Sequence, residues 1–277
     1  MNRVAGKVAF ITGIARGQGR AHAVRLAEEG ADIIGIDVCA DLPYVDYPLA
    51  TEDDLLETVQ LVEALGRRIV VGKADVREPA SMRAVLDEGV DRLGRLDFVL
   101  ANAGVMPTWG RFAQHREAWQ VCLDVMLTGV LNTVELTYPI LRDRGEGGSI
   151  VITGSMAATK PMMRTEGSHT LGLLGYAAAK SALVNLAQNY ASFLAYHHIR
   201  VNVVHPTGVD TPMINNSMMD EHSDIANPED RLVLVNAIPV NRVEPIDVAN
   251  TVLWLCSAES RYFTGNAVRI DAGAFLR

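Results

Sequence analysis

The chain has 277 residues, of which 49% are hydrophobic, and it carries a formal net charge of −8. A chain of this size and composition can bury one large core, so we expect one domain spanning residues 1–277. Its acidity and the lack of a clustered Lys/Arg stripe argue against a nucleic-acid partner. We identify no apolar segment long enough to cross a bilayer and no secretory signal, so we expect a cytoplasmic protein without membrane contact. Three scattered cysteines favour neither disulfides nor a metal site.

An apolar run at residues 8–11 breaks into three glycines and then continues in a helix-like pattern. The glycines are Gly13, Gly17 and Gly19. Glycine at these positions lets the backbone turn sharply and approach a ligand, and it leaves the first N–H groups of the next helix free to bind a phosphate. Because glycine-rich turns also serve structural ends, the glycines alone do not establish a nucleotide site.

A second apolar run, residues 31–36, ends in Asp37. This is about the spacing at which dinucleotide-binding folds place an acid on the adenosine ribose hydroxyls. A carboxylate there repels the 2′-phosphate of NADP but accepts hydrogen bonds from a free ribose diol, and Val38 adds no positive charge. We therefore expect a βαβ nucleotide-binding unit with NAD as its cofactor.

Strand-like and helix-like segments then alternate along the chain. Residues 38–51 are irregular and lead into an amphipathic helix over residues 52–65, which Thr51 and Asp54 are expected to cap. The apolar pattern predicts further strands over residues 69–74, 96–100, 149–153, 199–204 and 267–270, and helices over residues 119–141, 175–190 and 246–256. Residues 206–240 are expected to form a mobile substrate lid.

Three polar side chains suit the oxidation of an alcohol. Tyr176 and Lys180 lie four residues apart, so both project from one face of a helix. A free tyrosine titrates near pH ~10, too high for a base, but the ammonium group of Lys180 would stabilise the phenolate and lower that pKa. Ser155 would hold the substrate oxygen. Taken singly, each of these three residues has a structural explanation, such as a helix cap for Ser155. We expect His169 and His205 to be ordinary surface or core residues.

These motifs stand in the order typical of one enzyme family. The spacing T-G-x-x-x-G-x-G at residues 12–19, A-N-A-G at residues 101–104 and the Ser155, Tyr176 and Lys180 set resemble the short-chain dehydrogenase/reductase family. The resemblance covers essentially the whole chain. It implies an α/β Rossmann fold with a doubly wound, mostly parallel seven-stranded sheet and helices on both faces, and it assigns Ser155, Tyr176 and Lys180 as catalytic residues. It also implies a homotetramer, with helices over residues 119–141 and 176–196 available for packing.

The same resemblance implies contacts to the cofactor. Asp75 would accept a hydrogen bond from the adenine amino group, Lys180 would donate to the nicotinamide ribose, and Thr211 would hold the carboxamide. Arg16 is discordant, because a basic residue there often accompanies NADP in this family, but Asp37 decides for NAD. The expected cofactor-binding residues are Gly13, Arg16, Gly17, Gln18, Gly19, Asp37, Asp75, Val76, Asn102, Ala103, Gly104, Tyr176, Lys180, Pro206, Gly208, Val209 and Thr211.

One position departs from the family pattern. Where D-V-N-L-T-G is expected, the chain has Asp124-Val125-Met126-Leu127-Thr128-Gly129. Met126 replaces the asparagine that normally holds a water connecting the catalytic lysine to solvent, and a thioether is only a weak acceptor. Besides the preferred NAD-dependent oxidoreductase of secondary alcohols or ketones, this leaves open a catalytically impaired, NAD-binding sensor or scaffold.

Two longer segments indicate a branch of the family. Residues 38–66 form an insertion between the second and third strands, and Y-P-L-A-T at residues 47–51, L-V-E-A-L-G-R-R at residues 61–68 and P-T-G-V-D-T-P at residues 206–212 resemble the mycofactocin-coupled, carveol-dehydrogenase-like branch. The branch implies a small apolar or cyclic secondary alcohol, tightly bound NAD and a peptide-derived redox carrier. The alternative is a lid or packing loop without chemistry. Residues 162–174 also exceed the usual family length, and we expect them to form an enlarged rim beside the substrate.

Overall fold

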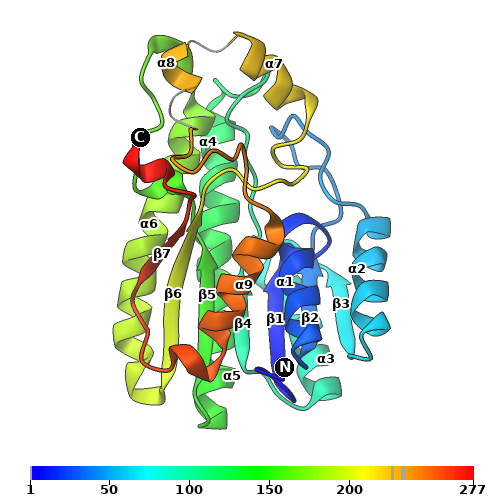
Figure 1. Cartoon of the computed structure of the whole chain (residues 1–277). Coiled ribbons are helices and arrows are strands. Elements are labelled where there is room, and N and C mark those ends of the chain that lie inside the picture. The colour runs from blue at the N-terminus through cyan, green and yellow to red at the C-terminus, as the bar shows by residue number, and fades with distance from the viewer. Residues whose placement is uncertain (1, 226–227, 232–234) are drawn as a thin grey trace.

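Seven parallel strands form one central sheet in the order β3-β2-β1-β4-β5-β6-β7 (Figure 1). The structure is a computed structural model that describes residues 2–225, 228–231 and 235–277. The prediction of a mostly parallel seven-stranded sheet is confirmed, and every strand pair is parallel. The strands are β1 (Val8–Thr12), β2 (Asp32–Asp37), β3 (Ile69–Lys73), β4 (Phe98–Ala101), β5 (Gly148–Thr153), β6 (Ile199–Pro206) and β7 (Ala267–Ile270).

Helices cover both faces of the sheet, because its inner strands are apolar on both sides. Two buried clusters of hydrophobic side chains result, one on each face. The first face carries α1 (Gly17–Glu28), α2 (Glu52–Ala64) and α9 (Pro245–Cys256). The second face carries α3 (Pro79–Leu93), α4 (Arg116–Leu123), α5 (Gly129–Arg144) and α6 (Leu171–Leu194).

The strand order reverses at β1. From β1 the chain moves outward to β2 and β3, and then returns to place β4 on the other side of β1. In open α/β sheets, ligands bind outside the carboxyl ends of the strands at such a reversal. The topology therefore directs attention to the ends of β1 and β4.

The second face departs from the sequence expectation in two helices. Arg116–Arg144 is one continuous helix, in which a π-helical turn (Asp124–Thr128) joins α4 to α5. By length and composition it could span a membrane, so the expectation of no such segment is wrong; half of its apolar window is buried inside the molecule. Helix α6 begins at Leu171 rather than Gly175, because the Thr170 hydroxyl accepts the Leu173 N–H and caps it.

The capping of α2 follows the sequence prediction. The Thr51 hydroxyl accepts the Asp54 N–H (3.2 Å), and the Asp54 carboxylate accepts the Thr51 N–H (2.8 Å). The segment expected as an insertion thus consists of irregular residues 38–51 followed by a regular helix. The expected lid contains two short helices, α7 (Ser217–Ile225) and α8 (Pro228–Arg231), and residues 226–227 and 232–234 of it lie outside the described part of the chain.

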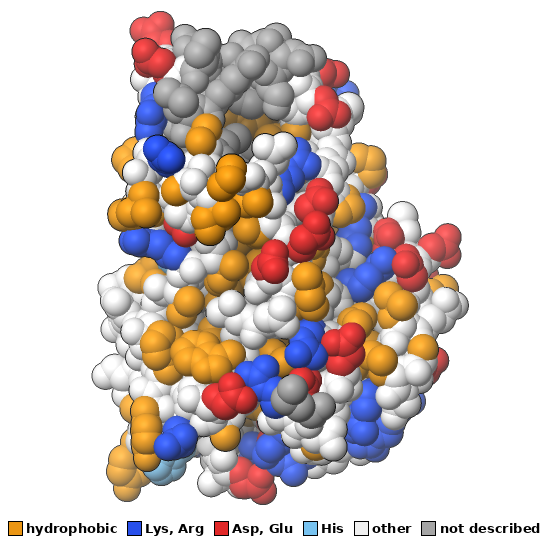
Figure 2. All heavy atoms as spheres, viewed as in Figure 1, with side chains coloured by type: hydrophobic (Ala, Val, Ile, Leu, Met, Phe, Trp, Pro, Cys, Tyr) orange, Lys and Arg blue, Asp and Glu red, His pale blue; other side chains and the backbone are white. Residues whose placement is uncertain are grey.

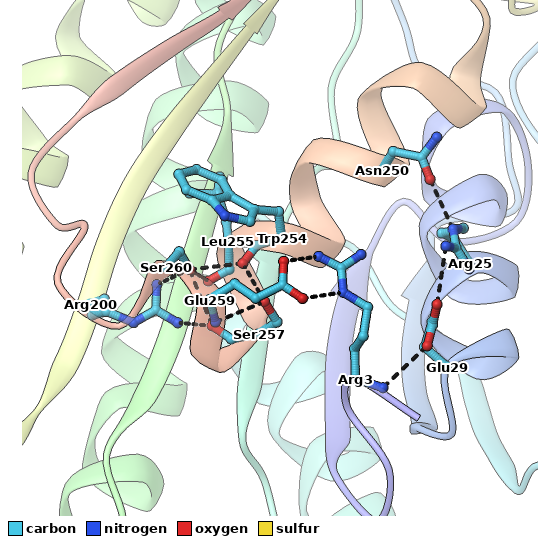
Figure 3. Close-up of polar contacts among 10 residues, drawn as sticks. All are labelled: Arg3, Arg25, Glu29, Arg200, Asn250, Trp254, Leu255, Ser257, Glu259 and Ser260. Carbon is cyan, nitrogen blue, oxygen red and sulfur yellow. Dashed lines mark hydrogen bonds and ion pairs between the residues drawn. The ribbon is translucent and has the colours of Figure 1, made fainter. Parts of the chain in front are cut away.

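Polar contacts hold the N-terminal segment, α1 and α9 together at the end of the sheet where the strands begin (Figures 1 and 3). Arg3 donates two hydrogen bonds to Glu259, at 2.8 and 2.6 Å. Arg25 bridges α1 and α9 by donating to Asn250 (2.8 Å) and pairing with Glu29 (3.2 Å). These contacts hold the C-terminal end of α1 against the N-terminal segment and α9.

Candidate active site

The glycine turn after β1 has the geometry that its sequence predicts. Gly13 and Gly17 have φ angles of +68° and +58°, a region that other residues rarely adopt. A Cβ on Gly19 would lie 1.9 Å from the Gly13 carbonyl oxygen, so α1 packs too closely on the turn for any side chain. The turn therefore brings the first N–H groups of α1 to the carboxyl end of the sheet.

Asp37, at the end of β2, is held in place by the same turn. Its carboxylate accepts hydrogen bonds from the N–H groups of Ala15 (3.0 Å) and Cys39 (3.3 Å), and its exposed fraction is 8%. Burial raises the pKa of Asp37, whereas these N–H groups and the charge of Arg16 act to lower it. The carboxylate is thus an oriented acceptor at the rim of a cleft.

This cleft opens at the carboxyl ends of β1, β2 and β4, where the strand order reverses. Most of the residues expected to bind the cofactor line it, namely Gly13, Arg16, Gly17, Gln18, Asp37, Asp75, Val76, Asn102, Ala103, Gly104 and Thr211. Gly19, Tyr176, Lys180, Pro206, Gly208 and Val209 lie outside this lining. The lining residues from strand ends far apart in sequence meet because all seven strands run in the same direction.

The cleft fits a dinucleotide in shape and in polar groups. The Gln18 side-chain oxygen is buried there with no hydrogen-bond partner among the described residues. Ala103 and Gly104 have small side chains or none, so they leave space at the floor of the cleft. Thr211 lies beside Gly17, since a Cβ on Gly17 would lie 3.2 Å from the Thr211 methyl group. Asp75 is paired with Arg77 through hydrogen bonds of 2.5–3.0 Å, so its carboxylate already has a partner.

Asn102 ties three strand ends together beneath the cleft. Its side-chain nitrogen donates to the carbonyl oxygens of Thr12 (3.1 Å) and Gly13 (3.3 Å), and its oxygen accepts from the Thr153 hydroxyl (3.3 Å). Asn102 therefore bridges neighbouring strands. Its amide group is occupied within the protein, so it shapes the floor of the cleft.

Ser155 and Tyr176 meet beyond the end of β5. Ser155 is 9% exposed, and its hydroxyl accepts the Ala157 N–H at 3.2 Å, which caps a short 3₁₀ turn. Burial raises the pKa of Tyr176, and a hydrogen bond with the Ser155 side chain acts to lower it. Helix α6 and strand β5 thus bring together two of the three side chains that the sequence singles out.

Lys180 lies one turn along α6 from Tyr176. Its ammonium group donates to the Thr153 carbonyl oxygen (2.6 Å) and lies 5.9 Å from the centroid of the Tyr176 ring. Burial lowers the pKa of Lys180 to about 8. Burial raises the pKa of Tyr176 and Lys180 is not among the groups that act on it, so the expected lowering of this pKa by Lys180 is not seen in this structure.

Met126 lies next to this lysine. It is fully buried on the π-helical turn, and a Cβ placed on Gly104 would lie 3.5 Å from the Met126 sulfur and 3.8 Å from the Lys180 nitrogen. π-helical turns of this kind are frequent at functional sites. The departure from the family motif therefore falls close to Lys180, which the family resemblance assigns as catalytic.

The insertion supplies cleft residues that the sequence analysis did not identify. Val38, Leu42, Tyr47, Leu49 and Ala50 all line the cleft. Tyr47 is 4% exposed, and its hydroxyl accepts the Met106 N–H at 3.0 Å, which fastens the insertion to the loop after β4. The apolar character of these residues indicates that they are buried, but no local sequence pattern predicts which surface they cover.

The two histidines differ in their positions. His169 is exposed in the segment between β5 and α6. The sequence predicts that this segment forms a rim over residues 162–174, but residues 171–174 belong to α6, so the rim is shorter than predicted. His205, near the end of β6, is fully buried, and its Nδ1 accepts the Ser155 N–H at 3.0 Å. His205 therefore has a partner that the sequence analysis did not find.

The fold and the site define an oxidoreductase domain of the Rossmann class, with a serine, a tyrosine and a lysine beside a nucleotide cleft. A family model described as enoyl-(acyl carrier protein) reductase matches residues 13–274. An uncharacterised oxidoreductase of Mycobacterium tuberculosis is 50% identical over 97% of this chain and 96% of its own length. The (-)-trans-carveol dehydrogenase of Rhodococcus erythropolis is 44% identical over the full length of both chains.

Two solved structures are similar along the whole chain. Carveol dehydrogenase from Mycobacterium avium, in complex with NAD, superposes with a TM-score of 0.90 at 43% identity and covers both chains completely. A short-chain dehydrogenase from Mycobacterium paratuberculosis, bound to NAD, has a TM-score of 0.91 at 43% identity over 99% of this chain and 100% of that chain. The chain belongs to the short-chain dehydrogenase/reductase family.

Proposed function

We propose that the protein is an NAD-dependent oxidoreductase that transfers a hydride between a secondary alcohol or ketone and nicotinamide. The observation that carries the proposal is the meeting of Ser155, Tyr176 and Lys180 beside a cleft that contains Asp37 and the glycine turn. The Asp37 carboxylate favours NAD over NADP because a 2′-phosphate would bring a second negative charge to it. Two relatives with known structures are described as bound to NAD.

Each of the three side chains has one task in this proposal. When bound, NAD supplies the ring carbon that accepts the hydride. Tyr176 removes the hydroxyl proton of the alcohol, Ser155 donates a hydrogen bond to the substrate oxygen, and the Lys180 ammonium group stabilises the phenolate. Main-chain N–H groups at the start of α1 would hold the pyrophosphate. In the reduction of a ketone, Tyr176 returns the proton.

Replacing Tyr176 with Phe tests the proposal. We expect the variant to lose alcohol-dependent NAD reduction by about 100- to 10,000-fold, the range typical of a lost general base, while its Kd for NAD stays unchanged. The matched control is Tyr190→Phe on the same helix, where the hydroxyl bonds Glu135 and should not affect turnover. Both rates are measured as NADH absorbance with a panel of secondary alcohols.

The alternative function is an NAD-binding sensor or scaffold, and Met126 is the observation that favours it. A wild-type protein that binds NAD but turns over no alcohol or ketone in a broad panel would support that alternative. Turnover that persists in Tyr176→Phe would instead contradict the assigned proton path. Binding and turnover measured on the same preparations separate these cases.

We further propose that the chain is a member of the mycofactocin-coupled branch and holds NAD tightly, with reoxidation by a peptide-derived carrier. The packing of residues 38–51 over the cleft supports tight binding, since Tyr47 is bonded to the loop after β4 and Arg16 donates to the Pro48 carbonyl oxygen. Burial of the cofactor by a docked segment slows its release.

A cytoplasmic location also stays a prediction.

Cofactor retention has a direct measurement. We expect protein purified without added nucleotide to release close to one equivalent of NAD or NADH upon denaturation, because the insertion must move before the cofactor can leave. Enzymatic assay of the released nicotinamide nucleotide measures this. Protein that arrives free of nucleotide, or that exchanges labelled NAD within the dead time of a desalting column, would count against the tight-binding branch.

A small apolar or cyclic secondary alcohol is the substrate class that the surroundings favour. Tyr47, Met218 and Met219 form a buried apolar cluster, and Met106, Trp109 and Met213 pack against it. These side chains come from the insertion, the loop after β4 and the lid region. Flexible thioether side chains adapt to apolar ligands of irregular shape. The description of a relative as (-)-trans-carveol dehydrogenase agrees with this class.

We also propose that the chain assembles as a homotetramer. Exposed apolar side chains on the outer helices support assembly, because stable interfaces between subunits bury such side chains. Leu131 on α5 and Phe193 on α6 are 39% and 58% exposed, and Leu276 near the C-terminus is 80% exposed. Figure 2 shows hydrophobic side chains gathered over α9 and the C-terminal elements.

A further inference from the structure

His205 is a buried titratable side chain that contacts Ser155 and has no role in the proposed function. The ring is fully buried, and its Nδ1 lies 3.0 Å from the Ser155 backbone nitrogen. Its Nε2 is buried and has no partner among the described residues. A histidine that only filled space would not need a hydrogen bond to the residue that orients the substrate.

The pairing of β5 with β6 creates this contact. Ile152 pairs with Val203 and Thr153 pairs with Val204, and the Gly154 N–H donates to the Val204 carbonyl oxygen at 2.7 Å. His205 therefore comes level with Gly154 at the ends of the strands. A Cβ on Gly154 would lie 2.3 Å from Nδ1 of His205, so the ring occupies the space that a side chain at 154 would need.

The hydrogen bond sets the tautomer of the histidine and the conformation of Ser155. Because Nδ1 accepts the Ser155 N–H, it carries no proton, and the proton of the neutral ring is on Nε2. Burial lowers the pKa of His205 to about 4, which agrees with a neutral ring. Ser155 adopts an extended conformation (φ −170°, ψ 158°), from which its hydroxyl reaches both the Ala157 N–H and Tyr176.

We propose that His205 is a positioning residue for the reaction, which holds the Ser155 main chain through Nδ1 so that the Ser155 hydroxyl points at Tyr176 and the substrate oxygen. This inference rests on the proposed oxidoreductase function and adds to it a residue outside the three catalytic side chains. His205 touches neither cofactor nor substrate in this role. Its effect reaches the reaction only through Ser155.

Three variants separate the two ring nitrogens. In His205→Asn the side-chain oxygen can take the place of Nδ1 and accept the Ser155 N–H, whereas in His205→Gln the terminal amide reaches the place of Nε2, and His205→Leu has no acceptor. We expect Asn to keep most of the wild-type kcat, and Gln and Leu to lose about 10- to 100-fold, the effect of a misplaced group. The Kd for NAD should not change. Equal losses in all three variants, or full activity in Leu, would overturn the proposal.

The dependence on Ser155 is tested in a double-mutant cycle. If His205 acts through Ser155, then His205→Leu should cost almost nothing in a Ser155→Ala background, so the two losses will be far from additive. Losses that multiply would assign His205 a general structural role instead. Circular dichroism of each variant shows whether it is folded.

A spectroscopic measurement tests the hydrogen bond without turnover. Nitrogen NMR of the wild-type protein labelled with ¹⁵N-histidine, with the His205→Asn variant for assignment, should show an unprotonated Nδ1 and a protonated Nε2 at neutral pH. A proton on Nδ1 would refute the proposal. A wild-type protein without alcohol turnover would refute the proposed function, while this measurement still decides whether His205 holds Ser155.

Discussion

Met126 is the side chain through which this chain departs most from its family, and its position makes the consequence testable. The Met126 sulfur and the Lys180 nitrogen lie 3.5 and 3.8 Å from the position that a Cβ on Gly104 would take, and a thioether is only a weak acceptor for an ammonium group. An amide oxygen in its place would stabilise the charged lysine and raise its pKa above about 8. We therefore expect Met126→Asn to shift the alkaline limb of the pH–rate profile, where Lys180 loses its proton, to higher pH.

The control for this prediction is Met126→Leu, which keeps the apolar volume but removes the sulfur. We expect its pH–rate profile to follow the wild type. Both profiles are recorded as kcat for alcohol oxidation between pH 6 and pH 10. If the asparagine variant also follows the wild type, the proton leaves the site by a route that does not pass residue 126.

Asp97, directly before β4, joins the start of β1 to the C-terminal end of α5. It is 1% exposed and accepts hydrogen bonds from the Val8 N–H (2.9 Å) and from Arg95 (2.8 Å), with Lys7 at 3.1 Å and Arg144 also in contact. Burial alone would raise the pKa of Asp97, but hydrogen bonds from Arg95, Arg144 and Val8 bring it below the ordinary value. The charged form therefore stabilises the folded state.

Replacing Asp97 with Asn should lower the free energy of unfolding by about 2 to 3 kcal/mol, because the amide carries no charge and has one acceptor oxygen where two buried carboxylate oxygens accept hydrogen bonds from Val8 and Arg95. The wild-type contribution is fully present above the unfolded carboxyl pKa of about 4 and is lost as the pH falls through the lower folded value, so the difference between wild type and variant should shrink below pH ~4. Urea unfolding at pH 7 and at low pH measures this.

The matched control for Asp97→Asn is Asp87→Asn on α3. Asp87 is 3.7 Å from Arg83, and both side chains are about half exposed. We expect this exposed pair to change the unfolding free energy by less than about 0.5 kcal/mol. A loss at Asp97 no larger than at Asp87 would contradict the stabilising role of the buried carboxylate.

The elements that the sequence predicts well are those whose cause is local. Strand β1, the glycine turn and Asp37 follow from sequence patterns within 30 residues. The Thr51 cap depends only on residues of the helix that it starts. The start of α6 at Leu171 was missed because its capping residue Thr170 is held by the Thr108 carbonyl oxygen, 62 residues away. His205 was missed for the same reason, since its partner is supplied by strand pairing that no single stretch of sequence reveals.

In the proposed tetramer, we expect the outward face of α6 to lie between subunits. Phe193 packs against Tyr138 of α5 at a centroid distance of 5.8 Å but stays 58% exposed in the single chain. A two-fold symmetric interface contains two copies of each such side chain, one from each subunit, and the burial of each copy contributes about 2 kcal/mol. Placing a charge there should therefore separate subunits across that interface without unfolding them.

We expect the wild-type protein to have four times the 30.0 kDa mass of one chain in light scattering, and Phe193→Glu to have half of that mass or less. The control is Leu56→Glu on α2, where a side chain of similar exposure (56%) lies outside the proposed packing helices and its replacement should leave the mass unchanged. The same preparations can be tested for NAD binding, which uses residues of the single chain and should survive dissociation. A tetramer that tolerates glutamate at 193 would move the interface away from α6, towards the apolar surface over α9 and the C-terminal elements.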